Sequence, residues 1–129
     1  MGRILAIDYG EKRIGLAISD EERKFSFELD IWSPHEFSEN IKALLAERNI
    51  EKIVLGHPLG MSGQKTAKTD EVEKFKKELE KIAQVPVELF DERLTSKMAG
   101  KISGDQKNID SLAAQIILEN YINKSNGNA

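Results

Sequence analysis

The sequence predicts a single α/β domain, in which one mixed β-sheet is covered by helices. Ile4, Leu5, Ala6 and Ile7 form a continuous apolar run, which is typical of a central strand buried on both faces. After residue 33, amphipathic helical segments alternate with short apolar strands. The expected order is three strands, helix, strand, helix, strand, a short helix and a last helix. Right-handed crossovers would make the later strands parallel to the first.

Composition narrows the class of protein. The chain has 129 residues, 40% of them hydrophobic, which suits one domain with its own core. The absence of cysteine excludes disulfides and thiolate metal sites. No apolar run has membrane-spanning length and no secretion leader is recognisable, so we expect a soluble cytoplasmic protein with no membrane partner. We expect the domain to occupy residues 1–122 and a flexible tail to occupy 123–129.

The first three strands are expected to form an antiparallel meander. The run Ile4–Ile7 ends at Asp8, the turn Tyr9–Lys12 follows, and Arg13–Ser19 returns as the second strand. Gly10 is expected to take positive φ in that turn. In Phe25–Ile31 apolar and polar residues alternate, which predicts a third strand at the edge of the sheet with one solvent-facing side.

The remaining elements follow from periodicity and from helix-start signals. Asn108 is expected to be the N-cap of the last helix. The expected elements are a helix from Pro34 to about Arg48, a strand Ile53–Gly56, a glycine-rich loop His57–Gly63, a helix Thr69–Ala83, a strand Val87–Phe90, a short helix Leu94–Gly100 and a helix Ile109–Ile122.

Acidic side chains stand at the ends of three buried elements. Asp8 ends the first strand, Asp91 and Glu92 end the last strand, and Asp110 opens the last helix. The carboxyl ends of parallel strands meet at one edge of a sheet, where such folds place their sites. Oxygen ligands converging from different elements suit Mg²⁺ or Mn²⁺. Each acid also has a local interpretation, as a turn residue, a helix-start residue or a partner of a neighbouring arginine.

The loop after the fourth strand is not a nucleotide-binding P-loop. Gln64 separates Gly63 from Lys65 and Thr66, and the P-loop pattern requires glycine directly before lysine. Lys65 and Lys68 could instead contact a phosphate backbone, or the loop could be an ordinary strand-to-helix connection. The net charge is −3, and Asp70–Glu80 is interpreted as part of a solvated helix face. Any basic surface must therefore be local.

Four motifs resemble one known family, YqgF (RuvX), and they occur in that family's order. They are residues 7–17 (IDYGEKRIGLA), 54–59 (VLGHPL), 91–96 (DERLTS) and 109–114 (IDSLAA). The resemblance implies a ribonuclease H-like fold with strand order 3-2-1-4-5. It also implies a relation to Holliday-junction resolvases and to maturation of the 5′ end of the small-subunit ribosomal RNA precursor (pre-16S rRNA).

The resemblance further implies that Asp8, Glu92 (or its neighbour Asp91) and Asp110 hold a divalent metal. Adjacent strand residues point to opposite faces, so only one of Asp91 and Glu92 is expected to reach the metal, and the family motif favours Glu92. Two departures are visible. The segment between Thr95 and Asp110 is shorter than the family pattern, and Gly56–His57 stands where RuvC-type resolvases carry an acid.

These observations predict a metal-dependent endonuclease of structured nucleic acid, acting as a monomer or a homodimer. Precursor ribosomal RNA is the leading substrate. The alternatives are a symmetric dimeric resolvase of branched DNA and a non-catalytic RNA-binding factor in ribosome assembly. The residues expected to hold the substrate backbone are all basic: Lys12, Arg13, Lys65, Lys68, Arg93, Lys97 and Lys101.

Overall fold

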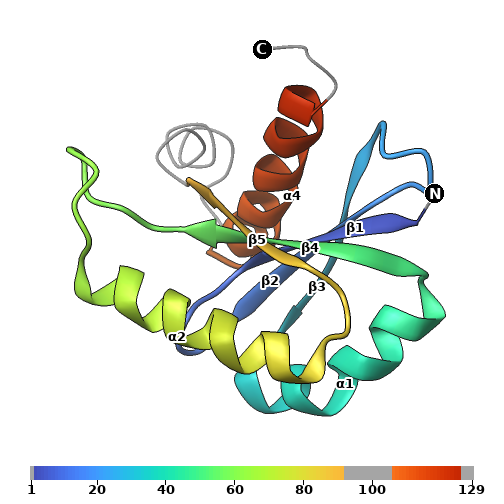
Figure 1. The fold of residues 1–129 in the computed structure, drawn as a ribbon, viewed down its shortest axis with the longest axis horizontal. Helices are drawn as coiled ribbons and strands as arrows, with labels where there is room; N and C mark the ends of the chain where they lie inside the picture. The colour runs from blue at the N-terminus through green and yellow to red at the C-terminus, as the bar shows by residue number, and fades with distance from the viewer. Residues whose placement is uncertain (1, 92–105, 126–129) are drawn as a thin grey trace.

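The computed structural model of the chain describes residues 2–91 and 106–125 (Figure 1). In these residues lie five strands and three helices. They are β1 (Arg3–Asp8), β2 (Ile14–Ser19), β3 (Ser26–Trp32), α1 (Pro34–Glu47), β4 (Ile50–His57), α2 (Ala67–Ile82), β5 (Val87–Asp91) and α4 (Gln106–Ser125).

The five strands form one mixed sheet with the order β3-β2-β1-β4-β5, which confirms the predicted topology. β1 pairs antiparallel with β2, and β2 pairs antiparallel with β3, so the meander with β3 at the edge is confirmed. β4 and β5 run parallel to β1. The three parallel strands therefore end at the same edge of the sheet.

Helices cover both faces of the sheet. α1 and α2 lie on one face and α4 lies on the other (Figure 1). Leu5 and Ile7 of β1 pack in the core beneath α1 and α2, whereas Ile4 and Ala6 pack beneath α4. This alternation explains the continuous apolar run, because each successive side chain of a strand buried on both faces enters one of two cores.

Side-chain caps fix where α1 and α2 begin. The backbone N–H of Glu36 donates to Ser33 Oγ, and the Glu36 carboxylate accepts from the backbone N–H of Ser33, which completes a capping box before Pro34. Thr66 and Thr69 make the same reciprocal arrangement at the start of α2. This cap starts α2 at Ala67, two residues before the predicted start.

Several local expectations were wrong. α4 already includes residues 106–108, so Asn108 lies in its first turn and is not the N-cap. Gly10 does not have positive φ; the positive-φ glycine in the described residues is Gly63, at 87°. A side chain at Gly10 is disfavoured for a different reason, because its Cβ would lie 2.7 Å from the carbonyl oxygen of Arg13.

Two further expectations concern the C-terminal third of the chain. α4 continues to Ser125, so its helical backbone extends three residues past the expected boundary at 122. The predicted short helix Leu94–Gly100 lies outside the described residues. Within those residues, no helix has both the length and the apolar character needed to cross a bilayer.

The first prediction tests a buried hydroxyl that joins β1 to β2. Ser19 is 1% exposed, accepts a hydrogen bond from the backbone N–H of Ile4 at 2.8 Å and donates to the carbonyl of Asp20 at 2.9 Å. Ser19→Ala leaves that N–H without its acceptor, so the free energy of unfolding should fall by about 1–3 kcal/mol in urea denaturation. The control Ser38→Ala removes an exposed hydroxyl from α1 and should leave stability within about 0.5 kcal/mol. Equal effects of the two changes would contradict the assignment.

Candidate active site at the carboxyl ends of the parallel strands

The carboxyl ends of β1, β4 and β5 bring three polar residues to one edge of the sheet. They are Asp8, His57 and Asp91, the last residues of their strands. His57 is the register partner of Asp91, and Ile7 is the partner of Leu55, so Asp8 lies beside Gly56. All three are partly buried, which leaves them reachable from solvent at the rim of a closed core.

The alternation of the strands places these side chains on two different faces. Phe90 packs in the core beneath α4 and Leu89 against the core beneath α1 and α2, so Asp91 follows Leu89 to the α2 face. His57 lies on that face too, where its ring contacts α2. Asp8 follows Ala6 to the face covered by α4. Asp8 and Asp91 are therefore on opposite faces of the sheet.

α4 runs from the carboxyl edge toward the other end of the sheet. Near its end, Tyr121 accepts a hydrogen bond from Lys52 at the beginning of β4. The earlier residues of α4 consequently lie nearer the carboxyl ends of the strands. Asp110 belongs to this earlier part, in the second turn of the helix, on the face of the sheet to which Asp8 points. The structure describes neither the side chain of Asp110 nor any part of Glu92.

The donor chemistry at this edge fits a hard cation. Asp8 supplies carboxylate oxygens from the end of a rigid, buried strand, and oxygen is the donor that Mg²⁺ and Mn²⁺ prefer. The described side chains include no group of three His, Cys, Asp or Glu able to hold a metal, and two of the three expected ligands are not among them.

An acidic hollow lies beside Asp8 on the α2 side. It is lined by Tyr9, Glu11 and four residues of α2, Glu71, Lys74, Phe75 and Glu78. The Tyr9 ring stacks on Phe75 at 4.4 Å between centroids. Burial and the nearby glutamates raise the pKa of Tyr9, and a hydrogen bond with Glu11 raises the pKa of Glu71. This crowding of negative charge disfavours a phosphate backbone over the hollow itself.

The connection between β4 and α2 is held by hydrogen bonds. Thr69, fully buried at the start of α2, donates its hydroxyl to the carbonyl of Pro58. Within the loop, Gly60 N–H donates to the carbonyl of Gln64 at 2.8 Å, and Gly63 N–H donates to the carbonyl of Gly60 at 2.9 Å. The loop is thus a closed turn fixed to both the strand and the helix.

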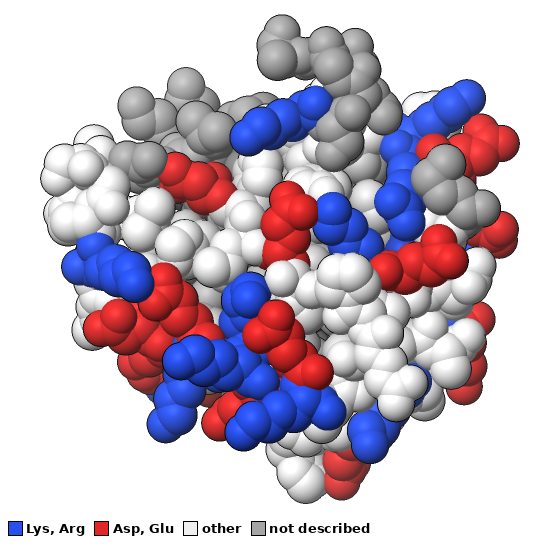
Figure 2. All heavy atoms as spheres, viewed as in Figure 1, with Lys and Arg blue, Asp and Glu red and all other residues white. Residues whose placement is uncertain are grey.

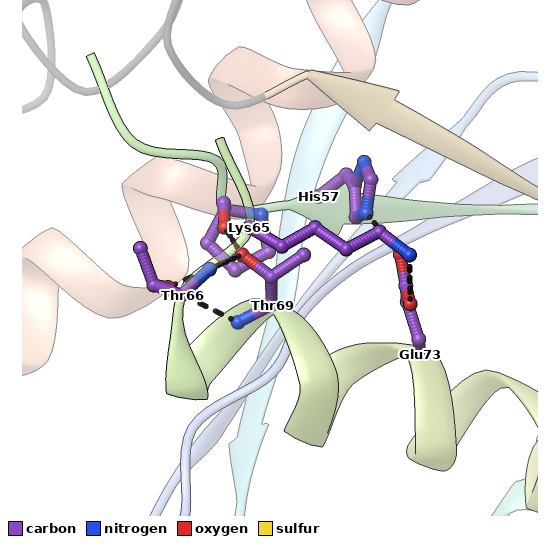
Figure 3. Close-up of polar contacts among 6 residues, drawn as sticks. His57, Lys65, Thr66, Thr69 and Glu73 are labelled. Atoms are coloured by element: carbon purple, nitrogen blue, oxygen red, sulfur yellow. Dashed lines mark hydrogen bonds and ion pairs between the residues drawn. The ribbon is translucent and has the colours of Figure 1, made fainter. Parts of the chain in front are cut away.

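Glu73 of α2 reaches back to the strand edge and binds two cationic or ionisable groups. One carboxylate oxygen lies 2.9 Å from His57 Nε2, and the other accepts from Lys65 Nζ at 3.0 Å (Figure 3). These two hydrogen bonds lower the pKa of Glu73. Sequence reasoning missed Glu73 by assigning the acids of 70–80 to a solvated face. Its spacing of four residues from the buried Thr69 would have identified the inward face.

The predicted substrate-binding residues are only partly brought together. Lys12, Arg13 and Lys68 are exposed, and Lys65 is exposed but paired with Glu73. Arg93, Lys97 and Lys101 lie outside the described residues. Figure 2 shows lysines and arginines interleaved with acids over this face of the molecule, so no single basic patch dominates the view.

Comparison with known proteins identifies the family. The family model described as "RuvX: Holliday junction resolvase" matches residues 2–124. A protein of Dictyoglomus turgidum named "Putative pre-16S rRNA nuclease" is 37% identical, covering 93% of both chains. One of Chlorobium phaeobacteroides with the same name is 38% identical, covering 98% of this chain and 95% of the relative.

Solved structures show the same fold. RuvC of Thermus thermophilus, solved with a Holliday junction substrate, superposes with a TM-score of 0.61 at 11% identity, covering 98% of this chain and 97% of that one. A second Thermus thermophilus RuvC structure gives a TM-score of 0.59. The sheet order and these neighbours confirm the ribonuclease H-like fold. The family model and the curated relatives show that the chain belongs to the RuvX family of nucleases.

Proposed function

We propose that this protein is a metal-dependent endonuclease that processes the 5′ end of the precursor of 16S ribosomal RNA in the cytoplasm. The observation that carries the proposal is the placement of Asp8, a carboxylate at the carboxyl end of a strand buried on both faces, in a chain of the RuvX family. The names of the relatives support the choice of substrate.

Asp8, Glu92 and Asp110 would hold the metal. Asp8 points to the α4 face and Asp110 belongs to α4, so both come from elements on the same side of the sheet. Asp91 points to the opposite face, which supports Glu92 as the third ligand. A bound divalent cation supplies Lewis acidity, both to activate water for attack on phosphorus and to offset charge on the departing oxygen.

The basic side chains near this edge would position the substrate. Lys12 and Arg13 lie in the connection between β1 and β2, and Lys65 and Lys68 flank the start of α2. With Arg93, Lys97 and Lys101 they would contact phosphates, which orient a nucleic acid without reading its sequence. The acidic hollow around Tyr9 would keep the backbone from crossing that part of the surface.

A cleavage assay distinguishes the proposal from its rivals. The purified protein is incubated with a precursor RNA spanning the 5′ end of 16S rRNA and with a four-way DNA junction, each with Mn²⁺ or with EDTA. We expect Mn²⁺-dependent cleavage of the RNA. Cleavage of the junction alone would favour a DNA resolvase, and tight RNA binding without cleavage would favour a ribosome-assembly factor.

The second prediction concerns the carboxylate of Asp8. Asp8→Asn should reduce cleavage and Mn²⁺ affinity at least about 100-fold, because it removes a direct metal ligand. Even the loss of a group that only hydrogen-bonds to a ligand typically lowers metal affinity or activity about 10–100-fold. The core residues around it are unchanged, so the melting temperature should be retained. Isothermal titration with Mn²⁺ and a single-turnover assay measure the two effects. Full activity in Asp8→Asn would exclude the metal role.

The third prediction separates Asp91 from Glu92. Glu92→Gln should abolish cleavage, whereas Asp91→Asn should retain most of it, because Asp91 lies on the face away from Asp8. Each variant loses one carboxylate, so they serve as matched controls for charge. The reverse result, with Asp91→Asn inactive and Glu92→Gln active, would assign the ligand to Asp91.

The fourth prediction concerns substrate affinity and salt. Lys97→Ala and Lys65→Ala should each weaken RNA binding, and removing one phosphate-binding side chain should reduce the slope of log K against log salt by about 0.7–0.9. Neither change should alter which substrate shape is preferred. Lys81→Ala, in the last turn of α2, is the control and should leave the slope unchanged. Unchanged slopes in all three variants would place the nucleic acid elsewhere.

A further inference from the structure

His57 occupies a central place at the edge where the proposed substrate lies. It is the last residue of β4, the strand between β1 and β5, and it follows Gly56, which lies beside Asp8. Its side chain is 16% exposed, so it lies at the rim and not in the core. The side chain of His57 lies on the α2 face and that of Asp8 on the α4 face, so a nucleotide bound at Asp8 reaches His57 where it crosses the carboxyl edge of the sheet.

The carboxylate of Glu73 determines how the imidazole of His57 is oriented. Glu73 Oε2 lies 2.9 Å from Nε2, and its second oxygen is occupied by Lys65. The two hydrogen bonds hold the pKa of Glu73 below its usual value, so this group is a carboxylate at neutral pH. A carboxylate only accepts, so Nε2 must carry the proton.

This pairing fixes what the second ring nitrogen can do. In a neutral imidazole with its proton on Nε2, Nδ1 is a hydrogen-bond acceptor. Nδ1 lies on the side of the ring away from Glu73 (Figure 3). When the ring is neutral, Nδ1 is therefore the acceptor that His57 can offer to a ligand at this edge.

Hydrogen bonds fix the backbone that follows His57 to the start of α2. Pro58, the next residue, accepts a hydrogen bond from the buried hydroxyl of Thr69, and Thr69 also closes the cap of α2. Glu73 lies one helical turn after Thr69 on that helix. The charged groups that face the ring are Glu73 from α2 and Lys65, which pairs with Glu73, from the loop, with Asp91 of β5 on the same face of the sheet.

We propose that His57 Nδ1 accepts a hydrogen bond from a ribose 2′-hydroxyl of the substrate, and that Glu73 is the positioning residue that fixes the ring for this contact. Phosphate oxygens and the deoxyribose of DNA offer no donor, whereas the 2′-hydroxyl is the donor that distinguishes RNA from DNA. The amino and ring N–H groups of the bases are the other donors along a nucleic acid strand. The inference rests on the proposed function because it requires a nucleic acid bound across the edge at Asp8.

Binding measurements test this inference separately from catalysis. The Asp8→Asn protein, which should not cleave, is titrated by fluorescence anisotropy with a labelled RNA stem-loop. The same stem-loop is also prepared with single 2′-deoxy substitutions along one strand and as all-DNA. We expect at least one single 2′-deoxy substitution to weaken binding about fivefold, the effect of one neutral hydrogen bond. The effect should be independent of the base at that position.

Variants of His57 should change the preference for ribose and not the affinity for DNA. His57→Phe should abolish the fivefold difference. His57→Asn keeps a side-chain oxygen close to the position of Nδ1 and should retain part of it. If His57→Phe does not fold, His57→Asn and Glu73→Gln decide the question.

Glu73→Gln tests the positioning role. A glutamine amide can also donate to Nε2, which allows the other tautomer, so the ribose preference should fall while the melting temperature remains close to that of the parent. Glu80→Gln removes the same charge from an exposed i,i+4 pair with Lys76 on the same helix and should leave the preference unchanged. Lys65→Met should weaken RNA and DNA alike.

The outcomes separate the two proposals. An unchanged ribose preference in His57→Phe, or a preference that follows the base instead of the sugar, would overturn the role of His57. Mn²⁺-dependent cleavage by the wild-type protein would in that case leave the nuclease proposal intact. A His57-dependent ribose preference without any cleavage would overturn only the nuclease proposal. No RNA binding at all would overturn both.

Discussion

The burial of β1 on both faces is the constraint on which the rest of the structure depends. A central strand that contributes Leu5 and Ile7 to one core and Ile4 and Ala6 to the other needs helices on both sides. It also needs hydrogen-bonded neighbours at both edges, which β2 and β4 supply. Because side chains alternate along the strand, the same constraint directs Asp8 to the α4 face. The core thus determines on which side of the sheet a metal could be held.

Much of the fold could be predicted because it follows from strong local patterns. The apolar run of β1, the capping residue Ser33 and the helical stripe Phe37, Ile41 and Leu44 specify their elements without help from the rest of the chain. Boundaries were less predictable, as the early starts of α2 and α4 show. The start of α2 depends on two threonines that cap each other, and this signal is weaker than hydrophobic periodicity.

The candidate site was predictable only in part, because contacts between distant segments are not written in local patterns. The position of Asp8 followed from the end of β1. The face of Asp91 required the register of β5 on β4, and the role of Glu73 required α2 to pack against the strand that ends at His57. A helix-face argument can identify the inward direction of Glu73, but its partners, 8 and 16 positions away along the chain, follow only from the packing of α2. Gly10 shows the same limit, because a side chain at this position is disfavoured by the nearby carbonyl of Arg13 and not by the backbone dihedral of the turn.

The open edge of the sheet has a consequence for how copies of the protein behave in solution. β3 exposes Phe27, at 52%, and follows the exposed Phe25, at 64%. Among the described residues, no further strand pairs with β3. Such an edge is a template for intermolecular pairing. Two features oppose it. The register shift between β2 and β3 interrupts a flat edge, and Glu28 and Asp30 alternate with the apolar positions. Two edges approaching each other would bring like charges together, so colloidal stability at neutral pH depends on these carboxylates, and acidic buffers near the isoelectric point favour aggregation.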